Sequence, residues 1–339
     1  MNGDVLDFFV LTGFLGSGKT TLLRDFLGHP EAADTAVIVN EVGEIGLDGV
    51  LLREGSGELP IAMLSNGCVC CQIGSDLAFT IDRLIMAPRP AGAGPLRRII
   101  LEASGLSMPG PVLRTLATLA EHRIRVAVVG TFDLTRGSDV AAYEEAVAQW
   151  AAAHRIVATK ADLVASADLD DAPSMIANVN PLAEVVATAD RASTVLAAFA
   201  PLTALPRFDV ANVSGSAHPR VAVCLVRPVT EVAYADLAAW LDNLAGALGE
   251  RLLRIKGLVR VAESEQPLLI ESVGTTFSPP RPLRVEAAPV SCLVIIARDT
   301  EQSEVGQIAP AGLFELCSWK TPDPSGRTDR LAIRAEWVA

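Results

Sequence analysis

The residues that most directly predict chemistry lie near the start of this 339-residue sequence, in the segment Gly13–Thr20, which reads Gly-Phe-Leu-Gly-Ser-Gly-Lys-Thr. Glycine, four residues, then Gly-Lys-Thr is the pattern of a phosphate-binding loop, because glycines let backbone N–H groups turn inward onto phosphate oxygens. Lys19 is expected to open a helix and to reach the β- and γ-phosphates, and Thr20 to place its hydroxyl on Mg²⁺. We therefore predict that a nucleoside triphosphate binds here, through Gly13, Gly16, Ser17, Gly18, Lys19, Thr20 and Thr21.

A second motif predicts which base is bound. The segment Thr159–Asp162 reads Thr-Lys-Ala-Asp and follows an apolar run typical of a strand. The carboxylate of Asp162 can accept hydrogen bonds from the N1–H and the exocyclic amine of guanine, which adenine does not offer as paired donors. The aliphatic stem of Lys160 can lie over the purine ring. Thr159, Lys160 and Asp162 thus favour guanine, and a solvated start of a helix is the alternative interpretation of the same residues.

An acidic residue at the end of another predicted strand completes the expected magnesium site. Glu102 follows the apolar run Ile99–Leu101, and a carboxylate at such a position can hold Mg²⁺, usually through water. Gly105, three residues further on, could offer its backbone N–H to the γ-phosphate. Lys19, Thr20 and Glu102 are therefore the residues expected to act in hydrolysis, and an ordinary strand-end turn is the alternative for Glu102.

Three of the six cysteines lie within four positions, at Cys68, Cys70 and Cys71. Two or three thiolates on one tight turn suit a soft or borderline ion such as Zn²⁺, but they cannot complete a four-coordinate tetrahedral site alone. The missing ligand could be Glu44, a solvent molecule or a side chain of a client protein. A redox dithiol or a set of small buried side chains is the alternative interpretation of this cluster.

Composition limits the environment and the partners of the protein. Half of the residues are hydrophobic, a fifth are charged, and the formal net charge is −12, which argues against a broad nucleic-acid-binding surface. No apolar run approaches the ~18–20 residues of a membrane-spanning helix, and Asp4 and Asp7 make the N-terminus unlike a secretory signal. These features predict a cytoplasmic protein with no membrane and no nucleic-acid partner.

The elements that must position these residues follow an alternating order. Short β-branched runs alternate with amphipathic segments over the first ~200 residues, which is typical of a parallel sheet covered by helices. Strands are predicted at Phe8–Thr12, Val37–Val39, Ile61–Leu64, Ile99–Leu101, Val126–Val129, Ile156–Thr159 and Val185–Ala187. Helices are predicted at Lys19–Leu27, Leu77–Met86, Val112–Ala120 and Ala141–Ala153. The phosphate loop, Glu102 and the Thr-Lys-Ala-Asp segment then each follow a strand.

A second domain is predicted after residues 201–219, where Pro, Gly, Ser and Asn indicate a linker. Beyond this linker we expect a strand, a helix and three further strands, at Val221–Val226, Tyr234–Leu248, Leu252–Val261, Leu268–Ser272 and Val290–Ala297. This mixture indicates a smaller α+β domain on a mostly antiparallel sheet. The predicted α/β organisation is thus a P-loop NTPase domain with a mostly parallel sheet at 1–200, a C-terminal α+β domain at 220–318 and a tail at 319–339.

Taken together, the motifs resemble those of the CobW-type GTPases, which are related to the nickel-insertion GTPases UreG and HypB. Four segments carry the resemblance in this order: Gly13–Thr20, Asn40–Glu44 (Asn-Glu-Val-Gly-Glu), Gly67–Cys71 (Gly-Cys-Val-Cys-Cys) and Glu102–Leu106 (Glu-Ala-Ser-Gly-Leu). Three further segments also fit the family pattern: Thr159–Asp162, Asn180-Pro181 and the Arg-x-Lys-Gly segment Arg254–Gly257. The match extends over nearly the whole chain apart from its C-terminal tail.

The resemblance implies a GTP-dependent metal chaperone or insertase that couples GTP hydrolysis to the transfer of a metal to a client metalloprotein. It implies metal ligands at Cys68, Cys70 and Cys71, a nucleotide contact at Asn180, and GTP or GDP, Mg²⁺ and Zn²⁺ (or Co²⁺) as bound species. Two alternatives stay open, namely a non-catalytic metal-sensing or docking module that uses nucleotide as a switch, and a P-loop phosphotransferase. The oligomeric state stays open as well, and a homodimer is one candidate assembly.

Overall fold

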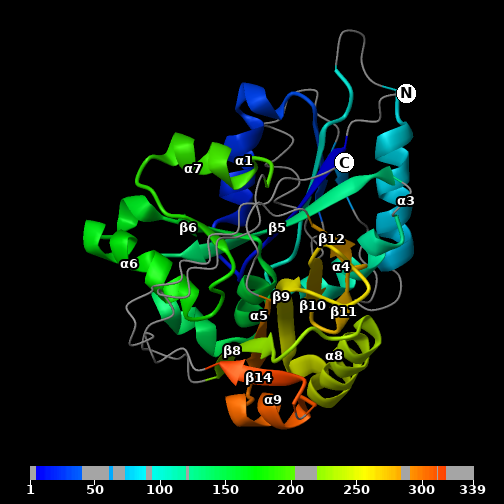
Figure 1. Cartoon of the computed structure of the whole chain (residues 1–339). Coiled ribbons are helices and arrows are strands. Elements are labelled where there is room, and N and C mark those ends of the chain that lie inside the picture. The colour runs from blue at the N-terminus through cyan, green and yellow to red at the C-terminus, as the bar shows by residue number, and fades with distance from the viewer. Residues whose placement is uncertain are drawn as a thin grey trace. The chain divides into compact units, whose positions relative to one another are not determined.

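The structure is a computed structural model that describes residues 5–39, 61–63, 73–88, 94–119, 122–202, 220–283, 291–310 and 312–317. The chain divides into two compact units. The first comprises Met1–Pro173 with Glu184–Pro201, and the second comprises Ser174–Ala183 with Leu202–Ala339. Figure 1 shows the elements of both units, coloured along the chain.

Within the described ranges, the first unit contains a seven-stranded sheet in which all neighbouring strands are parallel. Its strands are nearly continuous buried apolar runs, as expected for a parallel sheet covered on both faces. Their order across the sheet is β3-β2-β4-β1-β5-β6-β7. The strands are β1 (Leu6–Thr12), β2 (Thr35–Val39), β3 (Ile61–Met63), β4 (Arg98–Glu102), β5 (Ile124–Asp133), β6 (Arg155–Thr159) and β7 (Glu184–Val186).

Strand β1 pairs with β4 on one side and with β5 on the other, which brings residues that are distant in the sequence together. Leu11 is in register with Glu102 of β4 and with Val129 of β5. The chain runs from β1 to strands on the β4 side and later crosses from β4 to β5, so the carboxyl end of β1 lies at a topological switch point. Open α/β sheets bind their ligands at such a point, where the loops after neighbouring strands meet.

Helices connect the strands mostly where the sequence predicts them. α1 (Lys19–Leu27) has the predicted bounds, whereas α3 (Ile73–Met86) and α4 (Pro109–Ala117) begin earlier than predicted. Pro109 can open α4 because proline loses no helical hydrogen bond in the first turn. The single helix predicted over 141–153 is wrong at its start, since the extended residue Tyr143 separates α5 (Glu144–Ala152) from a short 3₁₀ segment. Three described helices are additional to the prediction: α6 (Ser166–Ala177), α7 (Arg191–Ala198) and, in the second unit, α9 (Gln302–Ile308).

In the part of the second unit that the structure describes, seven antiparallel strands and two helices share one core. The strand order is β11-β10-β9-β13-β8-β14, with β12 paired to β10. Trp240 stacks on Phe314 with ring centroids 4.1 Å apart, beside the buried residues Leu244 and Ile295. The elements are β8 (Val221–Pro228), α8 (Tyr234–Leu248), β9 (Leu252–Val259), β10 (Leu268–Val273), β11 (Thr276–Phe277), β12 (Arg281–Pro282), β13 (Cys292–Arg298), α9 (Gln302–Ile308) and β14 (Phe314–Cys317).

The family-like segment Arg254–Gly257 lies in β9, where two cationic side chains are buried. Lys256 pairs with Glu271 of β10, with Nζ and Oε1 2.7 Å apart. Burial lowers the pKa of Lys256 and lowers the pKa of Arg254 to about 10. These cations therefore belong to the framework of the second unit, and the carboxylate of Glu271, which pairs with Lys256 and attracts Arg254, offsets part of the cost of removing them from water.

The fold class predicted from the sequence is confirmed. A P-loop NTPase core on a parallel sheet is followed by a C-terminal domain on an antiparallel sheet. Among the described residues, no helix combines the length and the apolar character that crossing a membrane requires.

Candidate functional site

The segment between β1 and α1 has the backbone conformation of a phosphate-binding loop. The φ angles of Gly13, Gly16 and Gly18 are all positive, at +147°, +71° and +90°. A Cβ atom at Gly13 would lie 2.0 Å from Oγ1 of Thr131, so a larger residue does not fit there. Gly18 is the N-cap of α1, and it has no side chain that could occupy the N–H groups of the first turn. Those N–H groups are therefore suited to binding an anion.

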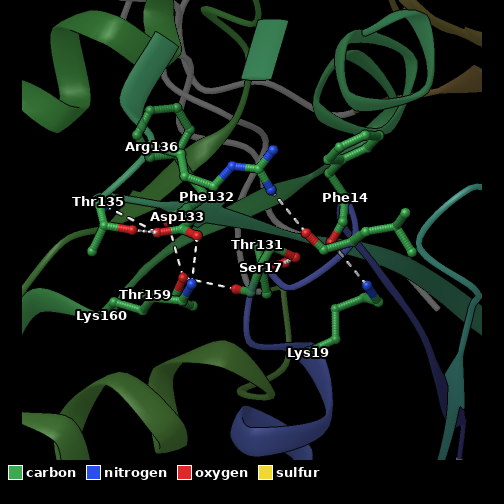
Figure 2. A network of polar contacts seen from close by, with 11 residues as sticks. Phe14, Ser17, Lys19, Thr131, Phe132, Asp133, Thr135, Arg136, Thr159 and Lys160 are labelled. Carbon is green, nitrogen blue, oxygen red and sulfur yellow. Dashed lines mark hydrogen bonds and ion pairs between the residues drawn. The ribbon is translucent and has the colours of Figure 1, made fainter. Parts of the chain in front are cut away.

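Lys19 is held by the loop that precedes it. The residue is only 9% exposed, and its Nζ donates to the carbonyl oxygen of Gly13 at 2.7 Å. It also donates to the carbonyl oxygen of Phe14 at 3.1 Å (Figure 2). A positive charge is thus fixed beside the loop backbone, where the phosphates of a nucleotide are expected to bind.

Strand β5 and the turn after it brace the same loop. The hydroxyls of Ser17 and Thr131 lie 2.6 Å apart, and both residues are buried. Nη1 of Arg136 donates to the carbonyl of Leu15 at 3.0 Å (Figure 2). The Arg136 guanidinium also lies 5.4 Å from the centroid of the Phe14 ring, within the range of a cation–π contact. The shape of the loop therefore depends on residues more than a hundred positions away in the sequence.

Thr20 of α1 and Glu102 at the end of β4 meet beside the loop. The Thr20 hydroxyl donates to Oε1 of Glu102 at 2.6 Å, and Glu102 is 5% exposed. A hydroxyl oxygen and a carboxylate oxygen are hard ligands of the kind that Mg²⁺ prefers, with waters and phosphate oxygens in its other positions. The donor set of this pair therefore fits the predicted magnesium site.

The loop after β4 packs directly on the phosphate loop. A Cβ atom at Gly105 would lie 2.8 Å from the backbone nitrogen of Leu15 and 2.9 Å from its Cα, so only glycine allows this approach. The N–H of Ala103 donates to the carbonyl of Leu11 at 2.9 Å, which continues the pairing of β4 with β1. Gly105, the predicted γ-phosphate contact, is therefore adjacent to the loop that is predicted to bind the other phosphates.

The end of β6 reaches the phosphate loop through Thr159, the last residue of the strand. Its hydroxyl lies 2.8 Å from the carbonyl oxygen of Ser17 and 3.1 Å from that of Phe132, in position to donate to either (Figure 2). Lys160 follows with a left-handed backbone, at φ 59°, and its Nζ donates to Oδ2 of Asp133 at 2.6 Å. The predicted base-binding segment is thus connected both to the phosphate loop and to the end of β5.

Asp133 is a site residue that the motif analysis does not identify. Its buried carboxylate accepts hydrogen bonds from Lys160 and, through Oδ1, from the N–H and the hydroxyl of Thr135 at 3.0 and 2.6 Å (Figure 2). Burial alone would raise the pKa of Asp133, but the bonds from Lys160 and Thr135 outweigh it and lower that pKa. The sequence contains only a weak signal for this residue, because Gly130, Thr131 and Phe132 separate Asp133 from the apolar run Val126–Val129.

Three other predicted contact residues are placed differently. Thr21 and Asp162 are exposed, Thr21 on α1 and Asp162 in the 3₁₀ turn Ala161–Leu163. Exposure leaves the Asp162 carboxylate available to a base that arrives from solvent. Asn180 is buried, and its Oδ1 accepts from the N–H of Leu182 at 3.0 Å, an arrangement typical of an Asx turn. The residues that the structure brings together are Gly13, Ser17, Gly18, Lys19, Thr20, Glu102, Gly105, Thr159 and Lys160.

The predicted transition-metal ligands lie outside the described residues: they are Glu44, Cys68, Cys70 and Cys71. Among the residues that are described, no three or more His, Cys, Asp or Glu side chains form a group that could hold a metal ion. The second unit carries the free thiols of Cys224, Cys292 and Cys317, of which the first two are buried. Burial raises the pKa of Cys224 to about 12 and that of Cys292 to about 11.

Comparisons with known proteins agree with this architecture. The family model described as "CobW/HypB/UreG, nucleotide-binding domain" matches residues 7–187, and that described as "Cobalamin synthesis protein cobW C-terminal domain" matches residues 221–308. The zinc chaperone CobW of Pseudomonas aeruginosa is 28% identical over 337 residues, which cover 87% of this chain and 88% of that protein. The zinc chaperone YjiA of Escherichia coli is 28% identical over 321 residues, which cover 90% of this chain and 97% of that protein.

A solved structure shares the fold. The crystal structure of Zn(II)-bound YjiA GTPase from E. coli superposes with a TM-score of 0.62 at 21% identity, covering 90% of this chain and 98% of that chain. The nucleotide-binding family model alone extends over more than half of the sequence, from β1 to β7. The resemblance that the motifs indicate is therefore confirmed, and the chain belongs to the CobW/HypB/UreG family of nucleotide-binding proteins.

Proposed function

We propose that this protein is a GTPase that serves as a zinc chaperone. It binds and hydrolyses GTP, and the change of nucleotide state controls whether a zinc ion is held or passed to a client metalloprotein. The observation that carries this proposal is the meeting of Thr20, Glu102 and Gly105 at the phosphate loop, since a magnesium-bound triphosphate needs these kinds of contact. The metal half is supported by the cluster Cys68–Cys71 and by the relatives, which are named zinc chaperones.

In this proposal the phosphate-loop backbone and Lys19 bind the phosphates, while Thr20 and Glu102 hold Mg²⁺. When bound, Mg²⁺ neutralises charge on the β- and γ-phosphate oxygens. The N–H of Gly105 contacts the γ-phosphate, so the loop after β4 is bound differently with GTP and with GDP. Guanine is recognised by the segment Thr159–Asp162, and the other proposed nucleotide contacts are Thr21 and Asn180.

The proposed zinc ligands are Cys68, Cys70 and Cys71, and the fourth ligand is Glu44, a solvent molecule or a group of the client. A fourth position that the cluster itself does not fill favours release of the ion over permanent storage. The thiols must be reduced and must lose their protons before they bind zinc, which favours a cytoplasmic location for this activity. Zinc is preferred to cobalt because the relatives named above are zinc chaperones.

The proposal requires that nucleotide and zinc affect each other's binding equally. If GTP tightens zinc binding by some factor, zinc must tighten GTP binding by the same factor. Zinc affinity is therefore measured by competition with a chromophoric chelator, on protein loaded with Mg²⁺·GMPPNP and on protein loaded with GDP. We expect the affinities to differ by at least about five-fold, the lower end of typical allosteric coupling. Equal affinities in the two states would refute the coupling.

A pair of cysteine variants tests the ligands. Cys70→Ser is expected to weaken zinc binding by about a hundred-fold or more. Removing a residue that only hydrogen-bonds to a metal ligand already lowers metal affinity by about ten- to a hundred-fold. Cys317→Ser is the matched control, since Cys317 lies in the second unit and outside the cluster. Unchanged zinc affinity in Cys70→Ser would refute the cysteine site. Zinc that stays bound through a full turnover of GTP would instead favour the metal-sensing alternative.

A further inference from the structure

The buried face of α5 contains one amide among apolar side chains. Gln149 is fully buried, and its neighbours on the helix include the buried residues Ala146, Val147 and Trp150. A buried amide is costly unless its polar atoms are hydrogen-bonded. A glutamine at this position therefore calls for an explanation that packing alone does not give.

The partners of Gln149 lie in the loop after β4. Its Nε2 donates to the carbonyl of Gly105 at 3.0 Å and to that of Ser107 at 3.1 Å. The N–H of Ser107 also donates to the carbonyl of Ser104 at 3.0 Å, so the loop forms a turn with the amide against it. In the part of the chain that the structure describes, Oε1 of Gln149 is buried and has no hydrogen-bond donor. The unpaired Oε1 is thus the energetic cost of the two bonds that Nε2 donates to this loop.

Helix α5 is a firm support for these bonds. Nε1 of Trp150 donates to the carbonyl of Thr131 at 3.0 Å, and its ring packs on Phe132 with centroids 5.0 Å apart. Tyr143, which precedes α5, stacks on Phe14 of the phosphate loop with centroids 4.6 Å apart. The amide of Gln149 is therefore fixed relative to β5 and to the phosphate loop.

The loop after β4 is consequently held between two fixed surfaces. On one side Gly105 lies against the backbone of Leu15, at a distance that only glycine allows. On the other side Gln149 holds the carbonyls of Gly105 and Ser107. We infer that Gln149 is a positioning residue that keeps the N–H of Gly105 oriented toward the γ-phosphate, and that it thereby sets the preference of the protein for GTP over GDP. This inference rests on the proposed function.

The physical reason is a cost of preorganisation. A loop that adopts its binding arrangement for only a fraction of the time weakens the apparent affinity by that fraction. The cost applies to GTP, whose γ-phosphate needs the loop, and it does not apply to GDP. Loss of the two bonds from Gln149 should therefore affect the two nucleotides differently, which a general loss of structure would not do.

The test compares Gln149→Leu with the parent protein. Leucine has a similar volume and removes the buried Oε1 together with the two donated bonds, so we expect the variant to fold. The affinity for Mg²⁺·GMPPNP, measured by displacement of a fluorescent nucleotide, should fall about ten-fold, and the affinity for GDP should change less than two-fold. Gln149→Met, which keeps the length of the side chain but has no hydrogen-bond donor, should show the same split. Gln302→Leu is the matched control, because Nε2 of Gln302 donates to a backbone carbonyl, that of Val223, in the second unit.

Four outcomes would overturn the inference. Equal losses of GMPPNP and GDP affinity in Gln149→Leu would show a general structural role, and unchanged affinities for both would show that the bonds do not matter. A change of equal size in Gln302→Leu would show that the effect is not specific to the loop. The parent protein is measured first, because a parent that binds GMPPNP and GDP equally has no preference for Gln149 to set and would overturn the inference, whereas a parent that binds neither nucleotide would overturn the proposed function.

Discussion

The Lys160 ammonium donates to Oδ2 of Asp133 at 2.6 Å, which joins the residue after β6 to the last residue of β5. Asp133→Asn keeps the size of the side chain but removes the charge that holds Lys160. We expect the affinity for GDP to fall about ten-fold, because a hydrogen bond between charged groups contributes about 1.5–3 kcal/mol. Isothermal titration with GDP measures the loss, and Asp139→Asn, at an exposed carboxylate, is the control. In a Lys160→Ala background, Asp133→Asn should have no further effect; additive losses would contradict the pairing.

The same pair predicts a pH dependence. Hydrogen bonds from Lys160 and Thr135 lower the pKa of Asp133 although burial opposes them. A carboxyl whose pKa is lower in the folded state stabilises the protein above its unfolded pKa of ~3.9, and this contribution is lost only as the pH falls through the folded value. Asp133 therefore stays charged and keeps its bond to Lys160 from pH 7 to about pH 5, so the contribution of this pair to GDP affinity should be nearly constant over that range. A decline centred well above pH 5 that Asp133→Asn abolishes would contradict the lowered pKa.

The guanine assignment depends on Asp162, whose carboxylate is exposed in the turn after Lys160. Asp162→Asn replaces an acceptor of two donated bonds with an amide, and GDP affinity should fall about a hundred-fold or more. The affinity of this variant for xanthosine diphosphate, which presents an oxygen in place of the exocyclic amine, should fall much less than its affinity for GDP or should rise. Competition against a fluorescent nucleotide measures both. The exposed Asp170→Asn is the control, and a parent protein that binds ADP as tightly as GDP would refute the assignment.

The proposed magnesium site depends on Thr20 and Glu102, whose oxygens lie 2.6 Å apart. Glu102→Gln keeps the hydrogen-bond acceptor but removes the charge that attracts a divalent cation. We expect GTP turnover at saturating Mg²⁺ to fall about a hundred-fold, as when other charge-stabilising groups are removed. GDP binding in EDTA should change little, since no cation takes part. Phosphate release and an EDTA titration separate the two effects, and equal losses in both would point to misfolding of the loop.

The thiols of the second unit should differ in reactivity. Burial raises the pKa of Cys224 to about 12 and that of Cys292 to about 11, and the thiolate is the nucleophile. Iodoacetamide at pH 8 should therefore label Cys317 in the native protein but label all three only after unfolding. Peptide mass spectrometry measures this result. Because both raised pKa values exceed that of an unfolded cysteine, ~8.5, the free energy of unfolding should also decrease as the pH rises above about 9.

Local sequence patterns predict the parts of the site that local structure determines. α1 has the predicted bounds because a glycine-rich loop, a lysine and an amphipathic period all indicate the same start. Glu102 and the segment Thr159–Asp162 are predicted as site residues because each comes at the end of an apolar run. Each of these predictions depends on residues within a few positions of the site.

The supporting residues depend on tertiary structure instead. Thr131 reaches Ser17 only because β5 lies beside β1, and the strand order cannot be read from the alternation of elements. Gln149 looks like a polar interruption of a helix until α5 is placed against the loop after β4. The early start of α4 is missed because Pro109, Gly110 and Pro111 are poor helix formers, although proline is well suited to the first turn of a helix.

The strand order also has a consequence for the nascent chain. The ribosome releases β1 and the phosphate loop first, but the residues that brace this loop, Glu102, Thr131 and Thr159, belong to β4, β5 and β6. Contacts between such distant positions form late, because long stretches of chain must close first. Until Thr159 has left the ribosome, the loop lacks at least one of its braces. The phosphate loop is therefore synthesised before its braces but is completed only after the last of them has been made.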